Sequence, residues 1–184
     1  MGKSERTRAR LADAALELFE RQGFEQTTVA QIAAAAGVTE MTFFRHFPAK
    51  HQVLFEDPYD ALIADAVAAQ PQDLHPLRRA AGGLRQAWSH VPEPDGDVVR
   101  RRVRIVADTP ALRGEMWRNN GETERLVAEQ LVRDGTGPLR AKVAAAAVLA
   151  AVTAALLEWS VSEAAPLGEA VLTALETVEG GRDE

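Results

Sequence analysis

The 27–47 stretch, TTVAQIAAAAGVTEMTFFRHF, contains the strongest fold signal in this chain of 184 residues. Its hydrophobic residues recur with a helical period on both sides of Gly37, whose backbone readily takes the left-handed conformation that ends a helix. Thr27 or Thr28 can cap the first helix with a hydroxyl, and Thr39 can cap the second. The pattern therefore predicts two short helices around a sharp turn, the arrangement of a helix-turn-helix.

The second of these helices has a polar face of the kind that contacts DNA. Hydroxyls, cations and the free amides of a helix N-terminus bind phosphate oxygens, and this helix enters the major groove in a helix-turn-helix. A helical hairpin inside an all-α core would have the same spacing, so the polar residues favour the DNA interpretation. The predicted DNA-contacting residues are Thr28, Thr39, Glu40, Met41, Thr42, Phe44, Arg45, His46 and Lys50.

Residues 6–54 resemble the DNA-binding head of TetR-family regulators. The resemblance rests on Leu11, Ala15, Phe19, Gly23, Thr28, Val29, Ile32, Ala33, Ala36, Gly37, Val38, Thr42, Phe47 and Lys50. It implies a repressor that binds a palindromic operator in double-stranded DNA as a homodimer and is released by a small apolar or acyl-type ligand. Met41 stands where the family usually has glycine, and Phe44 where it has a phosphate-contacting tyrosine. These departures keep open an alternative, a helical small-molecule-binding or scaffold protein that no longer binds DNA.

The composition describes a folded chain with charge unevenly distributed. Hydrophobic residues make up 46% of the sequence, and there is no cysteine for a disulfide or a thiolate metal site. The net charge is −6, but residues 1–50 carry +1 and the remainder −7, so a local DNA-binding patch is compatible with an acidic chain. Arg6, Arg8 and Arg10 fit either phosphate contacts or a solvated helix end. No export signal is visible, and the cytoplasm is the expected location.

The rest of the sequence predicts an all-α fold with about nine or ten helices. A helix-turn-helix DNA-binding domain is expected over residues 1–50, and a helical ligand-binding and dimerisation domain over 51–184. The Asp57–Pro58 step predicts a kink or break between the two, because proline removes a helical hydrogen bond donor. We interpret it either as a hinge between ligand binding and DNA binding, or simply as a helix start.

Two apolar helices close the chain. The 139–162 helix has an apolar run over 143–157 interrupted only by Thr153; the run is too short to cross a membrane, so burial on all sides is expected. The 166–178 helix has one apolar stripe, and a homodimer contact is predicted through the last two helices, because the 139–162 helix is apolar on more sides than one subunit can cover. The stripe consists of Leu167, Val171, Ala174, Leu175 and Val178.

No catalytic residue, metal site or cofactor is predicted. The four histidines are scattered and none has metal-ligand spacing, so an enzyme is not expected. A small-molecule ligand is expected in the second domain, because RVRIVADTPALR at 102–113, together with TFFRHFP at 42–48, resembles a regulator subgroup with an acyl-CoA-like ligand domain. The predicted ligand-binding residues are Trp88, Arg101, Arg104, Met116, Trp117 and Trp159. For any single one of the tryptophans or Met116, an ordinary core position is the favoured interpretation.

Overall fold

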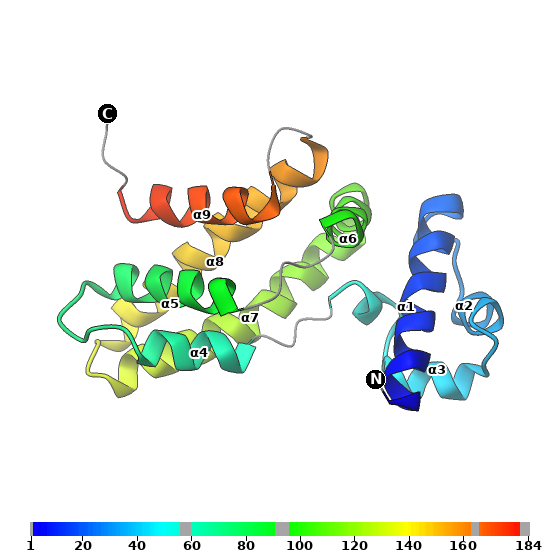
Figure 1. Ribbon diagram of the computed structural model, residues 1–184, viewed down its shortest axis with the longest axis horizontal. Coiled ribbons are helices and arrows are strands. Elements are labelled where there is room, and N and C mark those ends of the chain that lie inside the picture. Colours follow the sequence, from blue (N-terminus) through cyan, green and yellow to red (C-terminus); the bar gives the residue numbers. More distant parts are fainter. Residues whose placement is uncertain (1, 56–59, 91–95, 163–165, 181–184) are drawn as a thin grey trace. The chain divides into compact units, whose positions relative to one another are not determined.

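The computed structural model describes residues 2–55, 60–90, 96–162 and 166–180, and within them every regular element is helical (Figure 1). This confirms the predicted all-α class. The elements are α1 (Lys3–Gln22), α2 (Val29–Ala35), α3 (Glu40–His46), the 3₁₀ helix η1 (Lys50–Val53), α4 (Asp60–Ala68), α5 (Pro76–His90), α6 (Gly96–Asp108), α7 (Pro110–Arg133), α8 (Pro138–Val161) and α9 (Leu167–Val178). The Asp57–Pro58 step of the hinge hypothesis lies outside the described residues.

The chain divides into two compact units. The head unit comprises Met1–Glu56 and Arg101–Met116, and the body unit comprises Asp57–Arg100 and Trp117–Glu184. The end of α6 and the start of α7 therefore belong with the head, which the predicted division at residue 50 did not anticipate. Two side-chain contacts attach this segment: Arg101 forms an ion pair with Glu20 of α1, and His51 of η1 lies 3.4 Å from Glu115 of α7.

The head unit buries its core between three short helices. Leu11, Phe19 and Ile32 are inaccessible or nearly so, and the rings of Phe43 and Phe47 pack with centroids 5.7 Å apart. Gly37 makes the sharp turn with φ of +64°, while the Val38 amide donates to the Ala33 carbonyl at 2.9 Å. The Gly37 turn thus has the left-handed backbone expected from its sequence.

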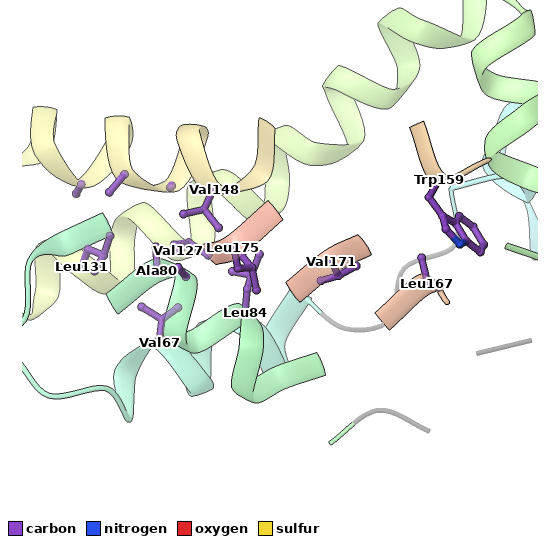
Figure 2. Packing of buried hydrophobic residues seen from close by; sticks show 14 residues of the cluster. Val67, Ala80, Leu84, Val127, Leu131, Val148, Trp159, Leu167, Val171 and Leu175 are labelled. Atoms are coloured by element: carbon purple, nitrogen blue, oxygen red, sulfur yellow. The ribbon is translucent and has the colours of Figure 1, made fainter. Parts of the chain in front are cut away.

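The body unit is held by a larger core to which α4, α5, α7, α8 and α9 all contribute (Figure 2). Helices α4 and α5 approach closely because α5 presents Gly83 to Val67; a Cβ at Gly83 would lie 2.7 Å from the Val67 Cα. A buried cation adds a specific link, since Arg79 donates to Asp134 at 2.6 Å and is only 1% exposed. Backbone proximity therefore holds α4 against α5, and the ion pair ties α5 to the end of α7.

The predicted dimer stripe on α9 is part of this core, which corrects the prediction. Leu167, Val171 and Leu175 are buried within one chain (Figure 2). Ala174 is also buried, and Val178 packs against the same cluster. The physical reason is that an apolar stripe looks the same in sequence whether it faces its own domain or a partner. Leu167, Val171 and Leu175 hold α9 on the body, whereas Ala174 also lines a groove between α8 and α9.

Helix α8 is only partly covered within one chain. The sequence predicted that it is apolar on more sides than one subunit can cover, and 28% of its most apolar 18-residue stretch is buried in the single chain. It is the one helix among the described residues that is long and apolar enough to cross a membrane by length and composition, a test that core helices of soluble proteins also pass. One side of α8 is therefore apolar and uncovered within a single chain.

Candidate nucleic-acid interface and ligand cavity

The two helices of the helix-turn-helix are capped as their sequence requires. The Thr28 hydroxyl accepts from the Gln31 amide, and the Gln31 side chain accepts from the Thr28 amide at 2.9 Å, forming a capping box at the start of α2. The Thr39 hydroxyl accepts from the Thr42 amide at 3.2 Å at the start of α3. These caps make seven-residue helices possible, because they bind backbone amides that have no partner in the first turn.

Helix α3 presents a mixed apolar and polar surface to solvent. Thr39, Glu40 and Arg45 are exposed, while Met41 and Phe44 are 74% and 49% exposed, unusual for large apolar side chains. Thr42 and His46 are half-buried at the edge of this surface, and Thr28 is exposed at the N-terminus of α2. The two residues that depart from the family pattern thus lie in the region where base contacts would be made, and their apolar surface suits thymine methyl groups.

Two of the arginines on α1 are occupied in holding the head together. Arg8 donates to the His46 carbonyl at the end of α3 and stacks 4.2 Å from the Phe47 ring centroid. Arg10 donates to the Ala36 carbonyl at the end of α2. Both cations lie at helix C-termini, where unpaired carbonyls and the negative end of the helix dipole favour them. They stabilise the position of α1 on α2 and α3.

Lys50, predicted to contact phosphate, is directed into the head instead. Its ammonium donates to the Phe24 carbonyl at 2.6 Å and the Thr27 carbonyl at 2.7 Å, and lies 4.1 Å from the Phe24 ring centroid. Burial lowers the pKa of Lys50, and the nearby carboxylate of Glu25 partly offsets this. This lysine therefore closes the α1–α2 turn, a role that sequence could not distinguish from a phosphate contact.

The body unit contains an apolar cavity of about 170 Å³. It is lined by Ile63, Leu84, Ala87, Trp88, Asn120, Thr123, Leu149, Val152, Thr153, Leu156 and Val171, from five helices. The polar residues lie together, and the Asn120 amide donates to the Thr153 hydroxyl at 2.8 Å. None of the lining residues is charged.

Of the predicted ligand-binding residues, Trp88 lines this cavity and the others do not. Trp117 is 65% exposed, and Trp159 is buried beneath the Arg100 guanidinium, 4.4 Å from its ring centroid. Arg101 forms a bidentate ion pair with Glu20 at 2.6 and 2.7 Å, which lowers the pKa of the Glu20 carboxyl. Arg104 and Met116 belong, like Arg101, to the head unit. The predicted arginine anchor is therefore absent from the cavity wall.

Sequence reasoning missed Asn120 and Thr123, although a signal was present. On α7 the inward positions are apolar before and after them, with Leu112, Val127 and Leu131 all buried. A polar interruption of an apolar stripe demands a hydrogen-bonding partner, and Thr153 interrupts the apolar run of α8 in the same way. Pairing the two interruptions would have located this wall of the cavity.

A helix-turn-helix head with an exposed recognition helix and a helical body with a cavity defines a class of DNA-binding regulators. Residues 11–57 match the family model described as bacterial regulatory proteins, tetR family, and residues 74–183 match that of the MftR C-terminal domain. The chain belongs to the TetR family of transcriptional regulators.

Individual relatives agree with this assignment. The chain is 37% identical over 141 residues to the HTH-type transcriptional regulator TcmR of Streptomyces glaucescens, covering 72% of this chain and 62% of TcmR. It is 26% identical over 181 residues to MftR of Mycobacterium tuberculosis, covering 94% and 89% of the two chains. The crystal structure of native NalD, from Pseudomonas aeruginosa, superposes with a TM-score of 0.63 at 25% identity, covering 99% of this chain and 100% of NalD.

Proposed function

We propose that this protein is a repressor that binds operator DNA through α3 and is released when a small molecule enters the body cavity. The observation that carries the proposal is the exposed face of α3, from Thr39 to Arg45, on a head in which Arg10 and Lys50 bind backbone carbonyls. NalD is the secondary repressor of a multidrug efflux pump, which supports repression as the sign of regulation. Such a protein acts where the DNA is, in the cytoplasm.

Each residue of this face has an expected part in binding. Arg45, Thr39 and Thr42 contact phosphates together with the α3 N-terminal amides, while Glu40 and Met41 lie nearest the bases. The phosphate contacts position the protein on the DNA and supply affinity, and the base contacts determine which sequence is preferred. Phe44 replaces a phosphate contact with an apolar one.

Fluorescence anisotropy with the promoter DNA that flanks the gene, at several salt concentrations, tests the proposal. Arg45→Ala should weaken binding to all sequences and reduce the slope of log affinity against log salt by about one. Met41→Ala should instead change the preferred sequence. If the wild-type protein binds this promoter no better than unrelated DNA of equal length, the alternative of a helical binding protein without DNA contact gains support.

We further infer a homodimer formed through the outward faces of α8 and α9. A groove of about 520 Å³ between these helices is lined mainly by small residues, among them Ala151, Ala154, Ala155, Thr173 and Thr177. Because small side chains let helices approach closely and α8 is largely uncovered within one chain, a second copy of this face is its expected occupant.

Light scattering distinguishes this face from the buried stripe of α9. Ala154→Glu and Thr173→Glu place charges in the groove and should give folded monomers. Leu175→Glu should unfold the body, because Leu175 is fully buried. Leu139→Glu, at an exposed position outside the groove, is the matched control and should remain a dimer. Folded dimers in both test variants would contradict the assignment.

A further inference from the structure

The ligand cavity has one polar wall in an otherwise apolar lining. Its apolar residues come from α4, α5, α8 and α9, whereas Asn120 and Thr123 project from α7 and Thr153 from α8. Thr123 and Thr153 are 5% and 9% exposed. Polar side chains are costly at such positions unless they are hydrogen-bonded, so their grouping at one cavity wall requires a physical reason.

The Asn120–Thr153 hydrogen bond satisfies only part of the bonding capacity of the two groups. Asn120 uses one amide hydrogen on the Thr153 oxygen at 2.8 Å. The Thr153 hydroxyl hydrogen can still donate, and the Asn120 amide oxygen can still accept. A ligand with one hydroxyl or carbonyl group can therefore join this pair without breaking it.

The charge of the lining excludes ionised ligands from this wall. None of the lining residues is Asp, Glu, Lys, Arg or His. An anionic head group placed here would lose its hydration without gaining a counter-charge, which is strongly unfavourable. Arg101, the anchor predicted for an anionic ligand, is paired with Glu20 in the head unit.

The volume of the cavity limits the size of the ligand that it can enclose. The cavity measures about 170 Å³, close to the roughly 150 Å³ at which an apolar protein cavity holds benzene. Ligand sites for drug-sized molecules usually span roughly 300–1,000 Å³. A single ring with one small substituent matches the space available.

We propose that the cavity selects a small uncharged ligand with one hydrogen-bonding group, and that Asn120 and Thr153 bind this group. The inference rests on the proposed function, because it names the ligand class for that same site. It replaces the expectation of an acyl-type anion held by arginine. Trp88, which lines the cavity, serves as a fluorescent reporter of occupancy.

Titration calorimetry of the full-length protein with phenol, toluene, benzoate and hexanoate tests the inference. The wild-type protein should bind phenol about ten-fold more tightly than toluene, the effect of roughly one net hydrogen bond. Benzoate and hexanoate, both ionised at neutral pH, should bind more weakly than phenol. Equal affinity for phenol and toluene, tighter binding of either anion, or no binding by any of the four probes would overturn the inference.

Variants then assign the preference to the polar pair. Thr153→Val keeps the side-chain shape and should reduce the preference for phenol over toluene, because only Asn120 then remains to bind the ligand's hydroxyl. Thr153→Ser keeps the hydroxyl and should retain the preference. Thr7→Val, a helical threonine on α1 in the head unit, is the control and should bind all four probes as the wild type does. An undiminished phenol preference in Thr153→Val would overturn the role of the pair. If the valine variant does not fold, loss of the phenol preference in Thr153→Ser would overturn it.

An experiment with bound DNA separates this inference from the proposed function. Phenol is added to the protein–promoter complex and anisotropy is followed. Phenol binding with the stated preference but without DNA release would leave the ligand class standing and contradict ligand-controlled repression. Release of DNA by hexanoate but not by phenol would support ligand-controlled repression and contradict the ligand class.

Discussion

The head and the body are both built from helices, yet they are stabilised by different means. In the head, helices of seven residues are fixed by hydroxyl caps and by cations that bind backbone carbonyls, as Arg10 and Lys50 do. In the body, helices of up to 24 residues pack through alanine, valine and leucine. A small unit cannot bury enough apolar area to hold short helices, so it depends on specific polar contacts.

This difference has a functional consequence for charge. Lys50 and Arg10 bind carbonyls within the head, so a count of basic residues overstates its capacity to bind phosphate. The body, in contrast, tolerates a polar pair at its cavity because its apolar core is extensive. The following predictions test how far each unit depends on its own kind of contact.

The largest loss of stability is expected from breaking the ion pair between Arg79 and Asp134 in the body. Asp134→Ala removes the counter-charge of Arg79, which is 1% exposed and bound at 2.6 Å. An uncompensated buried guanidinium should lower the free energy of unfolding by about 3 kcal/mol. Urea unfolding at neutral pH measures this. Arg125→Ala, which breaks exposed pairs with Glu122 and Glu129, is the control and should change little.

The same ion pair should make stability depend on pH. The hydrogen bond from Arg79, with a second from Gln130, holds the pKa of Asp134 below its usual value. Because the folded-state pKa is lower than the unfolded one of about 3.9, this contribution is fully present above that pH and is lost as the pH falls through the folded-state value. The stability difference between wild type and Asp134→Ala should therefore shrink in acid. A stability difference between the two proteins that stays constant down to strongly acidic pH would contradict this predicted pH dependence.

The second prediction concerns the close approach of α4 and α5. Gly83→Ala puts a Cβ within 2.4–2.8 Å of Val67 atoms, two of them backbone. The helices must separate, and we expect a loss of about 2 kcal/mol in the free energy of unfolding. Gly121→Ala on α7, where a Cβ would meet nothing within 4 Å, should instead stabilise by about 0.8 kcal/mol. Thermal and urea denaturation of the two variants would show opposite signs; equal effects would mean that backbone proximity is not what Gly83 provides.

The third prediction concerns the head. Lys50→Met keeps the apolar stem but leaves the carbonyls of Phe24 and Thr27 without their donor. A loss of about 1.5 kcal/mol is expected, seen as faster amide hydrogen exchange in α1 and α2 with the body unchanged. The salt dependence of DNA affinity should stay as in the wild type. A reduced salt slope would restore the original prediction that Lys50 contacts phosphate.

Sequence alone predicted the helices well, because the residues at their ends are ones that start, cap or terminate helices. Prolines begin α5, α7 and α8, threonines cap α2 and α3, and Gly37 turns the chain with positive φ. The stripe of α9 was assigned to a partner because periodicity shows that a face is apolar, and does not show what covers it. The sequence also does not show which way the Lys50 side chain points, because from the same backbone position it can reach either solvent or the Phe24 carbonyl.

The smallest effect is expected at Arg101, and it separates the two predictions made for that residue. As an anchor for an anionic ligand, Arg101 would be essential for binding; as the partner of Glu20, it joins α6 to α1 in an ion pair whose side chains are 37% and 40% exposed. Exposed pairs contribute little because water and salt screen them, so Arg101→Ala should lower the free energy of unfolding by about 0.5 kcal/mol, and less at high salt. Glu20→Ala should have a similar effect, and the double variant little more than either one, since both remove the same interaction. Calorimetry with the four cavity probes should give wild-type affinities in all three variants. A selective loss of hexanoate or benzoate binding in Arg101→Ala, with Glu20→Ala unaffected, would return this arginine to the ligand site.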